Sequence, residues 1–265
     1  MEEGGVKVLN FDEFCCGAHG LSILIETEVA SSESTNSKSY TLFDTGPDSI
    51  SLLRNLKALR VPVERISRVV LSHWHSDHSG GLISFLKYRA DVSRGTQSGE
   101  GAVKEDVNLE EGVVVDVHPS RPSLRGIAPA LAHSPPAPLL TSSPDATPAI
   151  DPSLVLCALP PDPSLPQILA SGGKIEKHAE EHVVADGCVW VSGEVPRVTE
   201  WEGGLGGGVR WVPGGEAEGD SERAGGKEGK WISEPHLMDE RFAVVDVEGK
   251  GLVIFSSYVF QILVC

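Results

Sequence analysis

The sequence predicts an α/β fold in which sheets are flanked by helices. A strand, a helix and a second strand follow one another between residues 40 and 72, which is the pattern of a βαβ unit. The remainder of the chain is rich in short β-branched runs. A length of 265 residues is enough for one large domain with a well-buried core. We therefore expect a single α/β domain over 1–265.

The expected strands are short runs rich in Val, Ile, Leu, Thr and Phe, and the expected helices follow turn or capping residues. In the first helix, Ile50, Leu53 and Leu56 are predicted to share the buried face. In chain order the elements are strands 21–27 and 39–43, a helix beginning at Asp48 or Ser49 and ending near Leu59, strand 68–72, helix 80–88, and strands 113–117, 183–185, 189–192, 242–247 and 252–256.

Proline and glycine are concentrated in two parts of the chain. Thirteen of the 18 prolines lie within 119–166, and 11 of the 29 glycines lie within 203–229. The stretches 93–111, 128–153 and 203–229 show neither a helical nor a strand period. We expect them to be flexible insertions, Pro-rich and Gly-rich, within one domain rather than linkers between two.

Composition excludes several classes of protein. The formal net charge is −16, from 22 basic and 38 acidic residues, and no basic run is present, which argues against nucleic acid as a partner. No apolar run is long enough to span a membrane. The acidic N-terminus lacks the apolar centre of a secretory signal, and five Cys without a CxxC pair are typical of a reducing compartment. These features predict a cytoplasmic protein.

The chemistry-bearing feature is a cluster directly after strand 68–72. His73, His75, Asp77 and His78 lie within six residues of one another, although the whole chain has only nine His. Imidazole and carboxylate are ligands suited to zinc and similar divalent ions. Chance clustering on a solvated turn is the alternative, and this density of His disfavours it.

The spacing suggests two metal ions. If the chain stays extended past the strand, His73 and His75 point the same way and reach one ion, while Asp77 and His78 reach a second ion at the turn. Two ions about 3.5–4 Å apart hold a bridging hydroxide and polarise an ester or phosphoryl oxygen. Asp77 is also the candidate catalytic residue.

His-x-His-x-Asp-His after a strand resembles the signature of the metallo-β-lactamase fold superfamily, and the upstream 43–46 segment FDTG strengthens the likeness. The resemblance implies an αββα sandwich and zinc, at two sites, with other divalent ions compatible. It also implies that Asp44 fixes the tautomer of a ligand His. A simple turn or helix-cap aspartate is the alternative for Asp44.

Further segments narrow the resemblance to one branch. They are HGLSILIE (19–26), LFDTGPD (42–48), LSHWHSDHSGGL (71–82), VSGEVPR (191–197) and GKGLVIFSS (249–257). The branch is named for 7,8-dihydropterin-6-yl-methyl-4-(β-D-ribofuranosyl)aminobenzene-5′-phosphate synthase. It implies a small-molecule substrate with an ester, lactone or phosphoester bond, pterin-like or ribosylaminobenzene-phosphate-like, attacked by a metal-bound hydroxide. Oligomeric state is not predicted.

The sequence departs from the branch pattern near its end. After Ser257 the branch continues with Ser-His-Ala-Gly and a later His, whereas this chain reads YVFQILVC over 258–265. The expectation is a C-terminally truncated domain with two protein ligands per ion, fewer than the three usual for catalytic zinc. The alternative function is therefore a catalytically incomplete member or gene-model fragment acting at most as a binding module.

Three further residues are candidates for substrate binding. His118 ends strand 113–117 and is followed by Pro, as is common in the branch, or else is simply a His in a Pro-rich turn. Glu194 and Arg197 follow strand 189–192, and the planar guanidinium of Arg197 suits a carboxylate or phosphate. The alternative is an ion pair between Glu194 and Arg197. His178 is not a candidate, and His182 is expected to be a surface or strand-edge residue.

Overall fold

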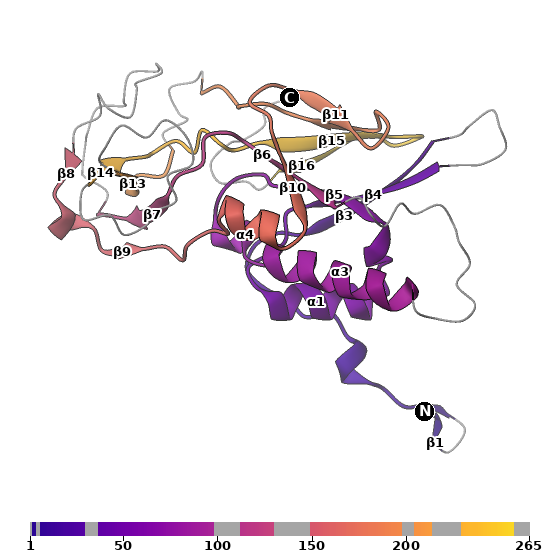
Figure 1. Ribbon diagram of the computed structural model, residues 1–265. Helices are drawn as coiled ribbons and strands as arrows, with labels where there is room; N and C mark the ends of the chain where they lie inside the picture. The colour runs from indigo at the N-terminus through magenta and orange to yellow at the C-terminus, as the bar shows by residue number, and fades with distance from the viewer. Residues whose placement is uncertain are drawn as a thin grey trace.

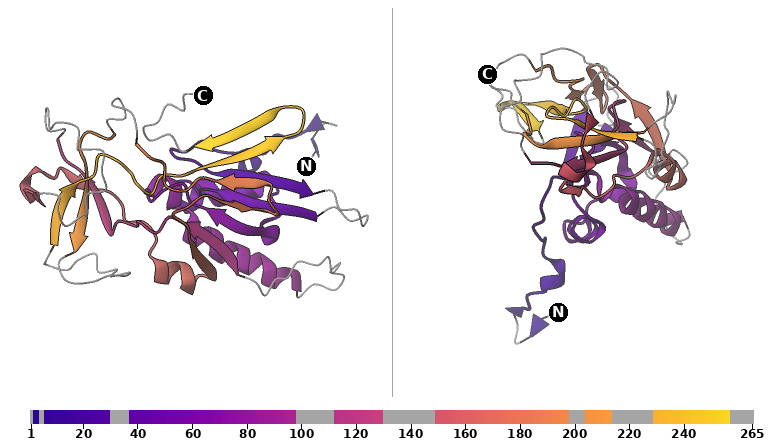
Figure 2. Two further views of the ribbon diagram at one scale, coloured as in Figure 1. Left: turned by 90° about the horizontal axis from the view of Figure 1, so that it is seen from above. Right: turned by 90° about the vertical axis from the view of Figure 1, so that its left-hand side faces the viewer.

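The computed structural model describes residues 2–3, 6–29, 37–97, 112–129, 149–197, 204–213 and 229–256. Two sheets pack face to face, and helices cover the outer side of the first sheet (Figure 1). A third sheet, of five strands, lies at one end of this sandwich (Figures 1 and 2). Within the described residues, none of the helices is both long enough and apolar enough to cross a membrane.

The first sheet is mostly parallel and has the strand order β10-β6-β5-β4-β3. Only β3 and β4 pair antiparallel, as a hairpin, while β5, β6 and β10 join the sheet in parallel. Parallel neighbours require crossovers, and α1 provides the crossover from β4 to β5. The strands are β3 Ile23–Val29, β4 Ser37–Phe43, β5 Ile66–Val70, β6 Val113–Val117 and β10 Gly173–Lys177.

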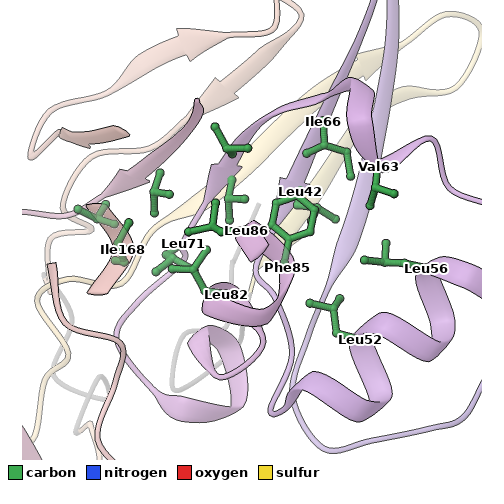
Figure 3. Close-up of a cluster of buried hydrophobic side chains, with 14 of the residues drawn as sticks. Leu42, Leu52, Leu56, Val63, Ile66, Leu71, Leu82, Phe85, Leu86 and Ile168 are labelled. Atoms are coloured by element: carbon green, nitrogen blue, oxygen red, sulfur yellow. The ribbon is translucent and has the colours of Figure 1, made fainter. Parts of the chain in front are cut away.

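Three helices cover one face of this sheet: α1 Ser49–Ala58, α3 Leu82–Gln97 and α4 Leu165–Ala170. The core between helices and sheet contains Leu42, Ile66, Phe85 and Ile168, all nearly inaccessible to solvent (Figure 3). Alternate residues of each strand supply it, as the two-residue period of a strand requires.

Asp48 caps α1 by accepting a hydrogen bond from the Ser51 amide at 2.8 Å, as predicted. The predicted buried face of this helix is partly wrong, because Ile50 is 78% exposed while Leu52 and Leu56 are buried. The helix is therefore rotated relative to the expectation. Leu52 and Leu56 are four residues apart and form the stripe that packs on the sheet.

The second sheet is antiparallel, with the order β11-β12-β15-β16. Its inner face contributes Val189, Val191 and Ala243, which pack against Ile25 and Phe43 of the first sheet. This apolar layer joins the two sheets into one sandwich. The strands are β11 His182–Val184, β12 Val189–Val191, β15 Phe242–Val247 and β16 Gly251–Ser256.

Two of the expected flexible insertions are partly wrong, because each contributes a strand to the third sheet. The predicted loop 203–229 contains β13, and the predicted loop 128–153 contains β8 and the short helix η4. Trp211, within the predicted loop 203–229, contacts the ring of Trp231 with centroids 5.7 Å apart, and Gly126 on the neighbouring strand leaves room for Trp231. Aromatic and β-branched residues between the glycines thus favour strands here. The strands are β7 Leu124–Ile127, β8 Ala149–Ile150, β9 Cys157–Ala158, β13 Gly208–Pro213 and β14 Gly229–Ser233.

The third expected insertion, 93–111, is also partly wrong, because α3 continues to Gln97 instead of ending near Tyr88. The segments 98–111, 130–148 and 214–228, and the C-terminal residues 257–265, lie outside the described residues. The remaining short elements are β1 Glu2–Glu3, β2 Val6–Lys7, η1 Phe11–Glu13, η2 Val63–Arg65, α2 Ser76–Ser79 and η4 Pro152–Leu154.

Candidate metal centre

The predicted ligand cluster lies directly after β5, where the chain leaves the first sheet. Strand-like geometry continues to His75, whose φ and ψ of −134° and 143° precede the single turn of α2. His73 and His78 are buried, while His75 and Asp77 are half-buried. The extended path explains why alternate residues of this segment face the same side.

A neighbouring turn holds this segment in place. The backbone N–H and the hydroxyl of Thr45 both donate to the carbonyl oxygen of His78, at 2.7 and 2.9 Å. Gly81 approaches the carbonyl of Thr45 so closely that a Cβ at residue 81 would clash with it. The two turns therefore fit together only with glycine at this position.

Asp44 is the centre of the hydrogen-bond network beneath the cluster. It is fully buried, and its φ of 61° places it in the left-handed region, which is rare for residues other than glycine. Its carboxylate accepts hydrogen bonds from the Ser72 amide, the Ser72 hydroxyl and Nδ1 of His78, each at 2.7 Å. Asp48, not Asp44, caps α1, so the alternative of a simple cap is excluded for Asp44.

This network determines which histidine nitrogens face the cluster. Nδ1 of His73 lies 3.0 Å from the Ser72 hydroxyl, which itself donates to Asp44. Nδ1–H of both His73 and His78 is thereby directed to Ser72 or Asp44, which leaves Nε2 of each ring on the side of the cluster. Such a second hydrogen bond is what fixes the tautomer of metal-binding histidines.

The cluster forms two close pairs. His73 Nε2 lies 2.9 Å from His75 Nδ1, and His78 Nε2 lies 3.5 Å from Asp77 Oδ2. The ring centroids of His73 and His78 are 4.4 Å apart, so the pairs are adjacent. The pairing agrees with the predicted grouping of His73 with His75 and of Asp77 with His78.

The protonation states of His73 and His75 suit cation binding, whereas His78 must lose a proton before it can bind a metal ion. Burial lowers the pKa of His73 well below its ordinary value and that of His75 to about 4, so both imidazoles are neutral near pH 7. Against the effect of burial, the hydrogen bonds and charges of Asp44 and Asp77 raise the pKa of His78 to about 9. The hydrogen bond with His78 in turn lowers the pKa of Asp77.

The donor set therefore fits divalent-metal chemistry: three imidazoles and one carboxylate, with ring tautomers fixed by Ser72 and Asp44. Its ligand atoms do not form a compact group of three, however. Among the described residues, one group alone brings three such atoms within 4.8 Å of one another, and it is Asp116, His178 and His182.

The three candidate substrate-binding residues differ in what they contact. His118 is buried, its Nδ1 accepts a hydrogen bond from the Ser120 amide, and its Nε2 lies 3.8 Å from Glu194 Oε2. Glu194 keeps 45% of its side chain exposed. The ion pair considered between Glu194 and Arg197 is wrong, because Arg197 bonds Glu240 at 2.9 Å and the carbonyl of Leu237 at 3.1 Å.

One supporting network was not predicted. Arg125 of β7 is buried and pairs with Asp239 at 2.6 Å and with Glu234 at 2.7 Å. Asp239 also accepts a hydrogen bond from the Trp74 amide at 2.7 Å, so the third sheet fixes the backbone inside the motif. Against burial, the charge of Arg125 lowers the pKa of Asp239. No sequence signal joins Arg125 to these partners, because it is 109 positions from Glu234 and 114 from Asp239.

His19 and the group Asp116, His178 and His182 were also missed. Nε2 of His19, an exposed residue in the segment before β3, lies 3.3 Å from Asp77 Oδ2. His182 lies on the edge strand β11, as expected, but it also donates to Asp116 at 2.7 Å, a contact that was not predicted. The spacing His178-x-x-x-His182 is the one signal in the sequence that could have indicated the group.

Comparison with known proteins supports the predicted resemblance. The family model of the metallo-β-lactamase superfamily matches residues 21–136, which include Asp44, the whole motif and His118. A curated relative, the 7,8-dihydropterin-6-methyl-4-(β-D-ribofuranosyl)-aminobenzene-5′-phosphate synthase of Methanocaldococcus jannaschii, is 42% identical over 69 residues. That alignment covers 26% of this chain and 22% of the relative.

Solved structures include two similar metallo-β-lactamases. Rm3 metallo-β-lactamase is 17% identical with a TM-score of 0.34, and the comparison covers 90% of this chain and 55% of that one. A metallo-β-lactamase of Cronobacter sakazakii with a HARLDQ motif is 14% identical with a TM-score of 0.33, covering 82% and 52%. This chain thus spans about half the length of both structures.

The family match and the two packed sheets, the first of them covered by helices, confirm the predicted α/β sandwich class. Residues 21–136 of this chain match the family model of the metallo-β-lactamase superfamily.

Proposed function

We propose that this protein is a metal-dependent hydrolase-type protein acting on an ester, lactone or phosphoester bond of a small molecule. The observation that carries the proposal is the arrangement around Asp44. One buried carboxylate orients His73, through Ser72, and His78 directly, so that their Nε2 atoms face His75 and Asp77. A divalent ion held there, zinc in particular, acts as a Lewis acid and lowers the pKa of water.

The side chains have separable roles in this proposal. His73 and His75 are neutral and supply nitrogen donors without first losing a proton. Asp77 stays ionised because its pKa is lowered. Since so acidic a carboxyl is a weak base, Asp77 suits cation binding better than proton removal. Exposed Glu194, beside His118, is a better candidate than Asp77 to contact a substrate.

The name of the archaeal relative extends the proposal to the substrate class. A pterin-like or ribofuranosylaminobenzene-phosphate-like compound is proposed on the 42% identity over 69 residues alone. Such a compound carries a phosphoester, which falls within the proposed reaction class. Like the assignment of site residues, this substrate is a proposal for the present chain.

The test combines metal content with turnover. Protein stripped with a chelator and reloaded with Zn²⁺ is assayed on a panel of p-nitrophenyl esters and phosphates, a lactone, and the phosphorylated ribosylaminobenzene. Activity that returns with the metal, and is lost in His75→Ala while the variant keeps the wild-type circular dichroism spectrum, supports the proposal. Absence of any metal-dependent turnover contradicts it.

A catalytically incomplete binding protein is the second candidate. One observation favours it: in the described part of the chain, the motif does not bring three ligand atoms within 4.8 Å. Two ligands per ion give weak control of coordination geometry. Metal binding without turnover on any substrate of the panel is the result expected for this second function.

A further inference from the structure

A second group of potential ligands lies between the two main sheets, apart from the motif. Asp116 is on β6 of the first sheet, His182 begins β11 of the second sheet, and His178 directly follows β10. One ligand atom from each lies within 4.8 Å of the others. The backbone N–H of His178 donates to Val117 at 3.0 Å, which fixes it beside Asp116.

From this arrangement we propose that Asp116, His178 and His182 form a binding site for one divalent transition-metal ion, which links the two sheets. The two imidazoles provide nitrogen donors and the carboxylate provides oxygen, a set that suits Zn²⁺, Ni²⁺, Co²⁺ or Cu²⁺ rather than Mg²⁺ or Ca²⁺. The site is independent of the proposed hydrolase function.

The distances are compatible with such an ion. Two donors at ordinary zinc distances in a tetrahedral site lie about 3.4 Å apart. His182 Nε2 is 2.7 Å from Asp116 Oδ2, so that pair opens by less than about 1 Å. His178 Nε2 already lies 3.4 Å from Glu176 Oε2, which offers a fourth donor at the edge of the group.

The histidine rings are arranged for one cation and not for two. They stack with centroids 3.9 Å apart and an interplanar angle of 19°. Two imidazolium ions at that separation would repel each other, since like charges at close range are unfavourable in a half-buried position. A single metal ion shared by both rings avoids this repulsion and is reached by one ligand atom each of His178, His182 and Asp116.

Two arginines contact the carboxylate of Asp116, and one of them competes with a metal ion for it. Arg241 is completely buried and bonds Asp116 Oδ1 at 2.9 Å, which holds the carboxylate in a fixed orientation with Oδ2 toward His182. Arg68 Nη1 lies 3.0 Å from Asp116 Oδ2 and 2.7 Å from Glu176 Oε2. Its guanidinium thus competes with a metal ion for the same oxygens, and removing it is expected to strengthen metal binding.

The experiment separates this site from the motif by working in a His75→Ala background. Full-length protein is stripped with a chelator, equilibrated with Zn²⁺ and desalted, and bound zinc is counted by mass spectrometry. Adding His178→Ala is expected to remove about one zinc per chain. Adding Glu181→Ala, which removes an exposed carboxyl between the two histidines in sequence, is the matched control and is expected to leave the count unchanged.

A second variant keeps all three ligands. Arg68→Gln removes the competing cation and is expected to bind Zn²⁺ several-fold more tightly, with a larger zinc-dependent rise in the unfolding temperature. The proposal is overturned if folded His178→Ala retains the full zinc count, or if Arg68→Gln binds zinc no more tightly than its parent. In the protein with an intact His75, absence of turnover on reloading while this zinc is bound would contradict the hydrolase function alone.

Discussion

At the scale of single residues, Asp44 determines the chemistry of the motif although it cannot itself reach a substrate. It is fully buried, and it orients two of the three motif histidines through hydrogen bonds of 2.7 Å. Its φ of 61° is tolerated by Asp and Asn better than by other residues with a Cβ. The position therefore combines a backbone requirement with a charge requirement, and the two can be separated by substitution.

Asp44→Asn keeps the turn but removes the carboxylate that holds the Nδ1 protons of His73 and His78 in place. Zinc affinity of the motif is expected to fall about 10- to 100-fold, the usual effect of losing the partner that orients a ligand histidine. Competition with a chromophoric chelator measures it. Asp48→Asn is the control, because Asn is an equally good helix cap. An unchanged affinity in Asp44→Asn would mean that the network is structural only.

Asp162 gives a pH dependence of stability at the same scale. Burial raises its pKa to about 6, against the hydrogen bond that it accepts from Ser79 at 2.5 Å. A raised carboxyl pKa favours folding when the acid is protonated, so this stability is present below about pH 4 and is lost as the pH rises through about 6.

Asp162→Asn keeps the acceptor oxygen and removes the charge. The variant is expected to be about 1–3 kcal/mol more stable than wild type at pH 7, and equal to it at pH 4. Urea unfolding at both pH values measures the difference. A variant that loses stability at pH 7 would show that the charged form of Asp162 is favourable in the fold.

At the scale of elements, one face of helix α1 packs on the first sheet, and substitutions can show which face it is. Leu52 is buried and Ile50 is 78% exposed, although the sequence pattern alone assigned Ile50 to the core. Leu52→Ala is expected to cost about 2–4 kcal/mol in the free energy of unfolding, from lost burial and a cavity. Ile50→Ala is the matched control, with an expected change within about 0.5 kcal/mol. Similar losses in denaturant unfolding of both variants would contradict this packing.

The elements that the sequence predicted are those with a local signal. The βαβ unit of β4, α1 and β5 was predicted because Tyr40, Leu42 and Val69 follow a clear strand period and Asp48 marks the helix start. By contrast, β10 (GKIEK) carries three charged residues, and it is a strand because it pairs in parallel with β6 along its whole length. Tertiary pairing of this kind leaves no local pattern.

The same distinction applies to the site. The motif and Asp44 were predicted from a few adjacent positions. The pairing of Arg125 with Asp239 and the group containing Asp116 were missed, since segments far apart in sequence bring them together. Arg197 shows the limit of local inference: its predicted neighbour Glu194 is three residues away, whereas its partner Glu240 comes from another segment.

At the scale of the whole molecule, the two sheets differ in what covers their outer faces. The first sheet is covered by α1, α3 and α4 (Figure 1). On the outer face of the second sheet, cross-strand pairs place Val183 beside Trp190, Trp190 beside Val244, and Val244 beside Ile254. Within the described residues this apolar row is partly open to solvent, with Val183 60% exposed.

An open apolar row next to the edge strand β16 favours association between chains. Ile254 is 38% exposed and belongs to the row, whereas its neighbour Phe255 is partly buried and packs against the core between the sheets. Ile254→Lys is therefore expected to reduce self-association while leaving the unfolding free energy within about 0.5 kcal/mol of wild type. Sedimentation velocity over a range of concentrations measures the association.

Phe255→Lys is the matched control one residue away, and it places a charge against the core. It is expected to destabilise the sandwich by about 1–3 kcal/mol, because apolar contacts are lost and the charge is partly removed from water. If Ile254→Lys were as destabilising as Phe255→Lys, the outer face of the second sheet would have to be covered, and the row would be part of a core. If neither wild type nor Ile254→Lys self-associates, the row does not mediate association between chains at the concentrations tested.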